Sequence, residues 1–355
     1  MAKQSPQVFK CAVIGAGGIA TDHVAGFQAH PQAEVIAIAD VSAERCNALA
    51  DRFKVARRYT STEDLLADKD IDVVGIALPN FLHAPVSIAA LNAGKHVFLD
   101  KPFALNVGEA RKVAALAKKK GRKLMLGMSH RFPAATQTLR SLVDDGVLGD
   151  VYTARAVWLR RSGIPKFGTW FCRKDQAGGG CLYDIGVHYL DKAMFSMNCY
   201  DVESVHGQVY TKFGNRKLGE GGWGKSDRGK HVFDVDDFAL AMVRLKGGRT
   251  IHLNVSWAAH QATPNEEYVQ LFGTEAGAIV DPLKLFRNGK DGHETIQYTL
   301  RPPAVSTNRH CHFIDTLLGK AAPLVTVDQA LKVQATLDAI YTSSATGREV
   351  RLPKK

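Results

Sequence analysis

The stretch that decides the fold is Val8–Ala20, VFKCAVIGAGGIA. Its first half is an apolar run typical of a buried strand, and its second half is a glycine-rich turn before residues 19–29, whose apolar spacing predicts a helix. A G-x-G-x-x-A motif in this position is typical of a turn that holds a dinucleotide pyrophosphate at a helix N-terminus. Gly15 permits the tight turn, Gly17 a close approach of the backbone, and Ala20 close packing of helix on strand. We therefore expect cofactor contacts from Gly15, Gly17, Gly18 and Ile19.

The next predicted strand, 35–39, ends in Asp40, roughly 20 residues beyond the motif. A carboxylate there accepts hydrogen bonds from the adenosine ribose and repels a 2′-phosphate, which favours NAD over NADP. Two alternatives stay open. Asp40 could instead cap the helix that starts after Ser42, and Arg45 could tolerate a phosphate.

The first 130 residues alternate strand and helix patterns with short connections, which predicts parallel strands covered by helices. The expected strands are 8–14, 35–39, 73–78, 96–99 and 123–127, and the expected helices are 19–29, 42–53, 84–93 and 106–120. This pattern predicts a doubly wound parallel sheet, a Rossmann NAD-binding domain, over residues 1–130.

Longer strands with partial alternation follow, at 151–159, 239–245, 249–257 and 267–272, with a tight hairpin turn at Lys246–Gly248 and helices at 183–197, 309–318 and 328–343. They predict an α+β domain over residues 131–355 with a large, mostly antiparallel open sheet. The two late helices are expected to pack back on the first domain. The glycine-rich, basic segment 212–230 could be a lid, a subunit contact or plain disorder.

Composition excludes several classes of protein. Of 355 residues, 45% are hydrophobic and 23% charged, which is ordinary for a globular protein. The longest apolar runs, such as 73–79, are far shorter than the ~18 residues of a membrane span. The run after Lys10 is too short for a secretory signal. Six cysteines without a C-x-x-C pair predict reduced thiols in the cytoplasm.

Net charge is the one unusual value. The 46 basic and 35 acidic residues give +11, which would permit attraction to nucleic acid. The basic residues are scattered, however, and the cluster at 118–123 ends a predicted helix, where cations favour the helix dipole. We therefore expect neither a nucleic-acid nor a membrane partner.

Five segments together resemble the Gfo/Idh/MocA family of sugar and inositol oxidoreductases, over almost the whole chain. They are Gly15–Ala20, Ala77–Asn80 with His83, Gly94–Pro102 (GKHVFLDKP), Gly180–His188 (GCLYDIGVH) and the tail 328–352. The resemblance implies cofactor contacts from Asn80, His83, Asp100 and Lys101. This chain has Asp100 where the family usually has glutamate, so the acid is one methylene shorter.

Lys101 follows a strand at the edge where parallel sheets bind ligands. The resemblance implies that it is the family lysine that contacts both the nicotinamide ribose and the substrate hydroxyl. Without the flanking motifs, it would be an ordinary surface lysine at a strand end.

Asp184 and His188 lie four residues apart, which places both side chains on one face of a helix. Hydride removal from an alcohol carbon needs a base for the hydroxyl proton, and imidazole titrates in a suitable range. Such a pair can also be merely structural. The glycine run 178–180 and the family D-x-x-x-H pattern favour catalytic roles for both residues and for Lys101.

Further substrate contacts are expected from Arg131 and Trp170, which the resemblance places near the substrate, together with Lys101, Asp184 and His188. Arg131 could instead pair with an acid in the core, and Trp170 could be packing. His310-Cys311-His312 lacks a second ligand pair, so no metal is expected.

These observations predict an NAD(H)-dependent dehydrogenase that acts on a secondary hydroxyl of a sugar, glycoside or cyclitol. His188 would be the acid/base, and Lys101 would position the oxygen. The resemblance leaves two alternatives: a redox-neutral, NAD-dependent enzyme that cleaves glycosides by transient oxidation, and a non-catalytic NAD-sensing regulator. A homodimer or homotetramer through the open C-terminal sheet is expected.

Overall fold

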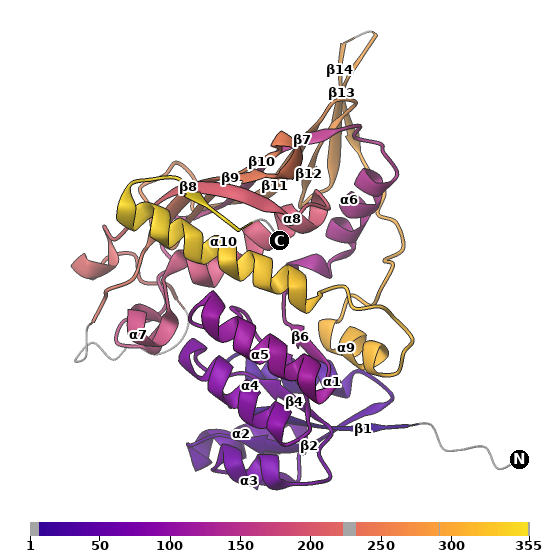
Figure 1. Cartoon of the computed structure of the whole chain (residues 1–355), viewed down its shortest axis with the longest axis vertical. Coiled ribbons are helices and arrows are strands. Elements are labelled where there is room, and N and C mark those ends of the chain that lie inside the picture. Colours follow the sequence, from indigo (N-terminus) through magenta and orange to yellow (C-terminus); the bar gives the residue numbers. More distant parts are fainter. Residues whose placement is uncertain (1–6, 223–231, 291, 354–355) are drawn as a thin grey trace, which may run out of the picture. The chain divides into compact units, whose positions relative to one another are not determined.

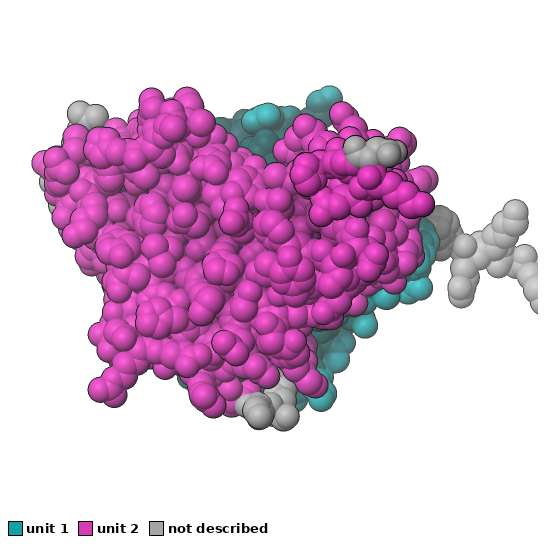
Figure 2. Space-filling model, turned by 90° about the horizontal axis from the view of Figure 1, so that it is seen from above, with its two compact units in different colours: residues 1–127, 305–327 teal, residues 128–304, 328–355 magenta. Residues whose placement is uncertain are grey.

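The computed structural model describes residues 7–222, 232–290 and 292–353. The chain forms two compact units, which Figure 2 colours separately. Unit 1 comprises Met1–Gly127 and Val305–Val327, and unit 2 comprises Met128–Ala304 and Asp328–Lys355. Each unit has its own sheet and core and is described separately.

Unit 1 is built on a six-stranded sheet in the order β3-β2-β1-β4-β5-β6, with every pair parallel. This order is that of a doubly wound dinucleotide-binding sheet, so the predicted Rossmann domain is confirmed. The strands are β1 (Phe9–Ile14), β2 (Ala33–Ala39), β3 (Arg57–Tyr59), β4 (Val73–Ile76), β5 (His96–Leu99) and β6 (Leu124–Leu126). All of these strands except β3 were predicted from the sequence.

Helices cover this sheet (Figure 1). They are α1 (Ala20–Gln28), α2 (Ala43–Phe53), α3 (Thr62–Ala67), α4 (His83–Asn92), α5 (Val107–Lys120) and α9 (Arg309–Leu317). Four of them begin at side-chain caps. Ser42, Ser61 and Asn106 each accept a hydrogen bond from the backbone N–H three residues later, and Asn308 accepts from those of His310 and Cys311. The late helix α9 packs against α1 and thereby joins the first unit.

Unit 2 is built on a nine-stranded sheet in the order β14-β13-β12-β11-β7-β10-β9-β8-β15. Only the central pair β7–β10 is parallel, so the expected mostly antiparallel sheet is confirmed. The strands are β7 (Val151–Arg160), β8 (Val202–Tyr210), β9 (Phe238–Leu245), β10 (Thr250–Ser256), β11 (Asn265–Gly273), β12 (Gly277–Val280), β13 (Lys284–Gly289), β14 (Gly292–Gln297) and β15 (Val350–Arg351).

The longer helices of unit 2 lie along one side of this sheet (Figure 1). They are α6 (Ala134–Asp144), α8 (Val187–Ser196) and α10 (Val327–Thr346), whose first residue belongs to unit 1; the short α7 (Lys174–Ala177) is also present. The expected helix 183–197 begins differently from the prediction, because Leu182–Gly186 form a π-helical turn before α8. Other single turns are Asn80–Leu82, Ser129–Arg131, Trp170–Cys172, Gly214–Arg216 and Lys246–Gly248.

Part of the segment 212–230 is described. Its first residues are held by the Asp237 carboxylate, which accepts hydrogen bonds from the backbone N–H groups of Lys212, Phe213 and Gly214. Residues 223–230 lie outside the described residues. No helix among the described ranges is long and apolar enough to cross a membrane. All six cysteines are free.

Candidate active site

The glycine turn of unit 1 has the backbone that its motif requires. Gly15 has φ +101°, and a Cβ atom there would lie 2.3 Å from the carbonyl oxygen of Ala77, so only glycine fits. Gly17 and Gly18 are exposed, and a Cβ atom on either would meet open space. The turn therefore leaves a cradle beside the first turn of α1 that suits a pyrophosphate.

Asp40, at the end of β2, is bound on both carboxylate oxygens. Oδ2 accepts a hydrogen bond of 2.8 Å from the backbone N–H of Ala16, and Oδ1 accepts from the backbone N–H of Ser42 and the guanidinium of Arg45. Burial alone would raise the pKa of Asp40, but the hydrogen bond from Arg45 and the two backbone N–H groups outweigh it, and the pKa lies below its usual value. Asp40 is therefore a fixed anion that links the glycine turn to α2.

The residues after β4 and β5 are tied together by His83. Its Nδ1 lies 2.7 Å from the carbonyl oxygen of Pro102 and its Nε2 lies 2.9 Å from that of Leu78. His83 is 1% exposed, and burial lowers its pKa. The side chain thus fixes the turn that carries Lys101, and Asn80 is buried in the same edge of the sheet. The NAD contacts expected of Asn80 and His83 stay predictions.

Asp100 is buried behind Lys101 and holds its backbone. Asp100 Oδ1 accepts a hydrogen bond of 2.8 Å from the N–H of Lys101, and Oδ2 lies 3.8 Å from His23 Nε2, an ion-pair distance. Arg309 of α9 lies nearby and donates to the carbonyl of Gly127. Burial alone would raise the pKa of Asp100, but His23 and Arg309 outweigh it, and the pKa lies well below its usual value.

His310 is part of the apolar packing around this carboxylate. Its ring lies 4.4 Å from that of Phe98 and 4.9 Å from that of His23. Burial lowers its pKa well below the usual value. Gly26 has no side chain because a Cβ atom there would lie 2.1 Å from His310 Nδ1. In the described part of the chain, no three His, Cys, Asp or Glu side chains are grouped as metal ligands would be.

Asp184 and His188 belong to unit 2, in the π-helical turn and in the first turn of α8. The Asp184 carboxylate accepts a hydrogen bond of 2.9 Å from the indole Nε1 of Trp257, which is fully buried just after β10. No sequence pattern indicated Trp257 as a site residue, because it lies 73 residues from Asp184. The indole fixes where the carboxylate oxygens lie.

The glycine run before this turn is explained by Asp236 and Tyr341. The Asp236 carboxylate accepts hydrogen bonds from the N–H groups of Gly180 and Leu182 and from the hydroxyl of Tyr341. A Cβ atom on Gly180 would lie 1.8 Å from the carbonyl oxygen of Asp236, and one on Gly179 would lie 2.0 Å from the Tyr341 hydroxyl. The glycines therefore allow the chain to approach this carboxylate. In the sequence, the acidic segment 234–237 was the one pattern that could have indicated a carboxylate partner for the glycine run.

An aromatic cluster contacts His188 through His130. The ring of His130 lies 4.6 Å from that of His188 and 5.8 Å from that of Trp158, and the rings of Trp158 and Tyr189 are 5.0 Å apart. His130 comes from the Ser129–Arg131 turn and Trp158 from β7. His188 itself is 9% exposed. These contacts restrict the orientation of the imidazole.

Arg131 is fully buried in unit 2. Its Nε and Nη2 donate to the two oxygens of Asp191, at 2.8 and 2.5 Å, and its Nη1 donates to Gln329. Asp191 lies on α8 three residues after His188, so the pair fixes this helix against the His130 turn. This geometry favours the core pairing that the sequence left open. The substrate contact of Arg131 stays a prediction.

Trp170 lies in the Trp170–Cys172 turn and is half-buried. Its ring stacks on Phe171, with centroids 3.8 Å apart. The expected substrate contact of Trp170 stays a prediction.

Comparison with known proteins identifies the class. Residues 9–128 match the family described as "Oxidoreductase family, NAD-binding Rossmann fold", and residues 136–279 match the "GFO/IDH/MocA C-terminal domain". The chain belongs to the Gfo/Idh/MocA family, as its motifs predicted. It is an NAD-binding oxidoreductase of this group of sugar and cyclitol dehydrogenases.

Two relatives and one solved structure illustrate the likeness. The chain is 31% identical to D-glucoside 3-dehydrogenase of Escherichia coli over 348 residues, which cover 97% of each chain. It is 30% identical to levoglucosan dehydrogenase of Pseudarthrobacter phenanthrenivorans over 288 residues, 76% of this chain and 72% of that protein. A structure of levoglucosan dehydrogenase in complex with NADH and levoglucosan has the same fold, with a TM-score of 0.84 at 23% identity, over 98% of this chain and 100% of that one.

Proposed function

We propose that this protein transfers hydride between NAD(H) and a secondary hydroxyl of a sugar, glycoside or cyclitol. The observation that carries the proposal is the cluster in which Trp257 holds Asp184 and His130 packs against His188. The full-length similarity to a D-glucoside 3-dehydrogenase supports the substrate class. A site that recognises polyols needs many fixed hydrogen-bonding groups rather than one charged anchor.

NAD⁺, when bound at the glycine turn and Asp40, supplies the nicotinamide C4 that accepts the hydride from the carbinol carbon. His188 would take the proton of the reacting hydroxyl, and the product would be a ketone. Lys101 would hold and polarise the same oxygen, and Asp184 would bind a neighbouring hydroxyl or orient the imidazole. In the reverse direction His188 would return the proton.

The experiment is a panel of monosaccharides, glycosides and inositols with NAD and NADP in parallel, followed at the absorbance of reduced nicotinamide. We expect NADH to accumulate in step with oxidised product. Product without released NADH would instead favour the redox-neutral glycoside-cleaving alternative. No turnover on the whole panel, together with capture of a protein partner, would favour the regulator.

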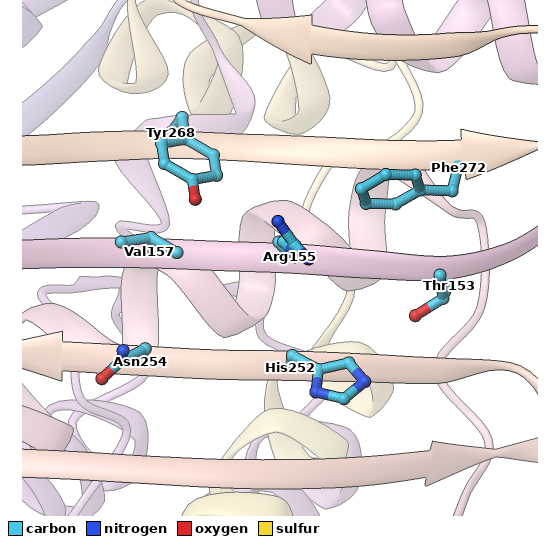
Figure 3. A pocket seen from close by; sticks show the side chains of 7 residues that line it. All are labelled: Thr153, Arg155, Val157, His252, Asn254, Tyr268 and Phe272. Atoms are coloured by element: carbon cyan, nitrogen blue, oxygen red, sulfur yellow. The ribbon is translucent and has the colours of Figure 1, made fainter.

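We also propose that the open sheet of unit 2 packs against a second copy of this chain. A hollow of about 420 Å³ lies on β7, β10 and β11 and is lined by Thr153, Arg155, Val157, His252, Asn254, Tyr268 and Phe272 (Figure 3). Leu240 and Met242 pair with Asn254 and His252 in the sheet, so they share this face, and they are 41% and 43% exposed. A mixed apolar and polar face that carries no helix suits a self-complementary contact.

The free cysteines support a place in the cytoplasm.

A further inference from the structure

Arg160 is the last residue of β7 in unit 2, close enough to Asp184 for the two charges to interact. Side chains alternate along a strand, so Arg160 shares a face with Trp158, which contacts Tyr189 of α8. Its guanidinium carbon lies 4.2 Å from the centroid of a Trp158 ring. Arg160 therefore lies on the helix side of the sheet, opposite the hollow of Figure 3.

The guanidinium of Arg160 has donors to spare. Within the described ranges the guanidinium makes no hydrogen bond and no ion pair at contact distance. The hydrogen bonds of Arg160 are those of its backbone, whose N–H donates to Ser256 Oγ and whose carbonyl accepts from it. The next residue differs, because Arg161 donates from Nε and Nη2 to the carbonyls of Gln261 and Ala262. Arginine carries five N–H donors, and in the half-buried side chain of Arg160 these donors remain available to the oxygens of a ligand, which would replace water there.

The charges around Arg160 indicate what that ligand is. Burial lowers the pKa of Arg160, while the charges of Asp184 and Glu267 act in the opposite direction. The charges of two carboxylates thus act on one guanidinium, so the charge at this end of β7 is not positive. An anionic substituent would meet this negative excess, whereas neutral hydroxyl oxygens can accept from the guanidinium and donate to the carboxylates.

The stacking on Trp158 adds geometric restriction. When a guanidinium stacks on an aromatic ring, the flat face of the guanidinium makes the contact. The N–H donors at the edge of the guanidinium therefore remain available. Trp158 is itself fixed, because its Nε1 donates to Asn265 and its ring packs on His130 and Tyr189. A fork held in this way can bind two neighbouring oxygens at once.

We propose that Arg160 is a substrate-specificity residue that donates to two neighbouring oxygens of a neutral polyhydroxyl ring. This inference rests on the proposed function. It assigns Arg160 to binding and leaves proton transfer to His188. Neutral sugars are therefore accepted in preference to the corresponding uronic acids.

The test compares Arg160→Met and Arg160→Lys with wild type on the best substrate of the panel. We expect Arg160→Met to raise KM by about 10- to 100-fold, the effect of losing charge-assisted hydrogen bonds, with kcat nearly unchanged. Arg160→Lys keeps the charge but loses the planar fork, so its KM should lie between the two. Arg249→Met is the matched control, because it removes a surface arginine of the same sheet that pairs with Asp150.

Deoxy analogues of the same sugar identify the oxygens. For one or two of the analogues, the wild-type KM should be higher than its KM for the parent sugar. For these same analogues, the KM of Arg160→Met should equal its own KM for the parent sugar. The inference is wrong if Arg160→Met leaves KM unchanged or lowers kcat alone. It is also wrong if the deoxy analogues raise the KM of Arg160→Met as much as they raise that of wild type. A preference of wild type for the uronic acid would also contradict it.

Failure of the proposed function has a different signature. If none of the polyols in the panel supports reduction of NAD by the wild-type protein, the proposed function is wrong. Arg160 is then tested by the rise in melting temperature that polyols cause in wild type. That rise should be absent in Arg160→Met, and an equal rise in both proteins would overturn the inference. Should Arg160→Met not fold, Arg160→Lys must show the raised KM and the loss of the deoxy effect.

Discussion

The indole Nε1 of Trp257 and the carboxylate of Asp184 are joined by a hydrogen bond of 2.9 Å. Trp257→Phe keeps the buried ring and removes this donor. We expect kcat to fall by about tenfold, the effect of one hydrogen bond to a charged group, with NADH affinity unchanged. A variant with wild-type kcat would show that this contact is only structural.

Lys101 gives the most direct test of the proposed chemistry. Lys101→Ala should lower turnover by about 100-fold or more, because the reacting oxygen loses its positioned cation. NADH binding, measured by fluorescence titration, should change little. Lys123→Ala, which removes an exposed lysine of the same unit, serves as the control. Near-normal turnover in Lys101→Ala would overturn the assignment.

Cofactor choice depends on Asp40 and the guanidinium bound to it. Asp40→Ser should raise kcat/KM for NADP relative to NAD by about tenfold or more, because it removes a carboxylate that repels a 2′-phosphate and frees Arg45 to bind one. Adding Arg45→Ala should reduce this gain, because it removes the guanidinium that would bind the 2′-phosphate. Glu44→Gln removes an exposed acid of the same helix and should leave the ratio unchanged. An unchanged ratio in Asp40→Ser would place the 2′-position elsewhere.

The stability of the protein should depend on pH through Asp100. Its pKa is lower in the folded chain than in the unfolded one, so its contribution is present at neutral pH and is lost as pH falls below the unfolded value of about 4. Asp100→Asn should lower the free energy of unfolding by about 3 kcal/mol at pH 7, and the difference from wild type should shrink below about pH 4. Denaturant titrations at several pH values measure it.

Asp175→Asn, at an exposed ion pair with Arg173, should change little across the same range of pH. A constant difference between Asp100→Asn and wild type from pH 7 to pH 3 would contradict the role given to the Asp100 charge.

Light scattering during size-exclusion chromatography tests the open sheet face. The wild-type chain should be a dimer or tetramer, and Met242→Glu should dissociate it, because a charge would be buried in the contact. Val147→Glu adds the same charge at a similarly exposed residue outside the strands. A monomeric wild type, or an unaffected Met242→Glu oligomer, would rule this interface out.

The doubly wound sheet could be predicted because each strand signal was local. Val73–Ile76 and His96–Leu99 are short apolar runs, and Ser42 and Asn106 mark helix starts. The strand Arg57–Tyr59 could not be predicted from its pattern, because three largely polar residues carry no period.

The site was less predictable than the fold. The D-x-x-x-H spacing indicated a helix, but not that its first turn is π-helical. The partners of Asp184 and of the glycine run, Trp257 and Asp236, are 73 and about 56 residues away, and no local pattern reports a contact over that separation. Arg160 lies one residue beyond the expected strand 151–159, and no sequence pattern indicates that its guanidinium lacks an acceptor in the described part of the chain.

Asp236 and Asp237 are consecutive but bind different loops: Asp236 holds the amides at Gly180 and Leu182, and Asp237 holds those of residues 212–214. Two neighbouring carboxylates therefore anchor both the turn that carries Asp184 and the first residues of the glycine-rich segment 212–230. An insertion within residues 212–214 would disturb the hydrogen bonds to Asp237 and, through the adjoining peptide, those to Asp236. We therefore expect relatives to differ in the length of this segment only beyond residue 214.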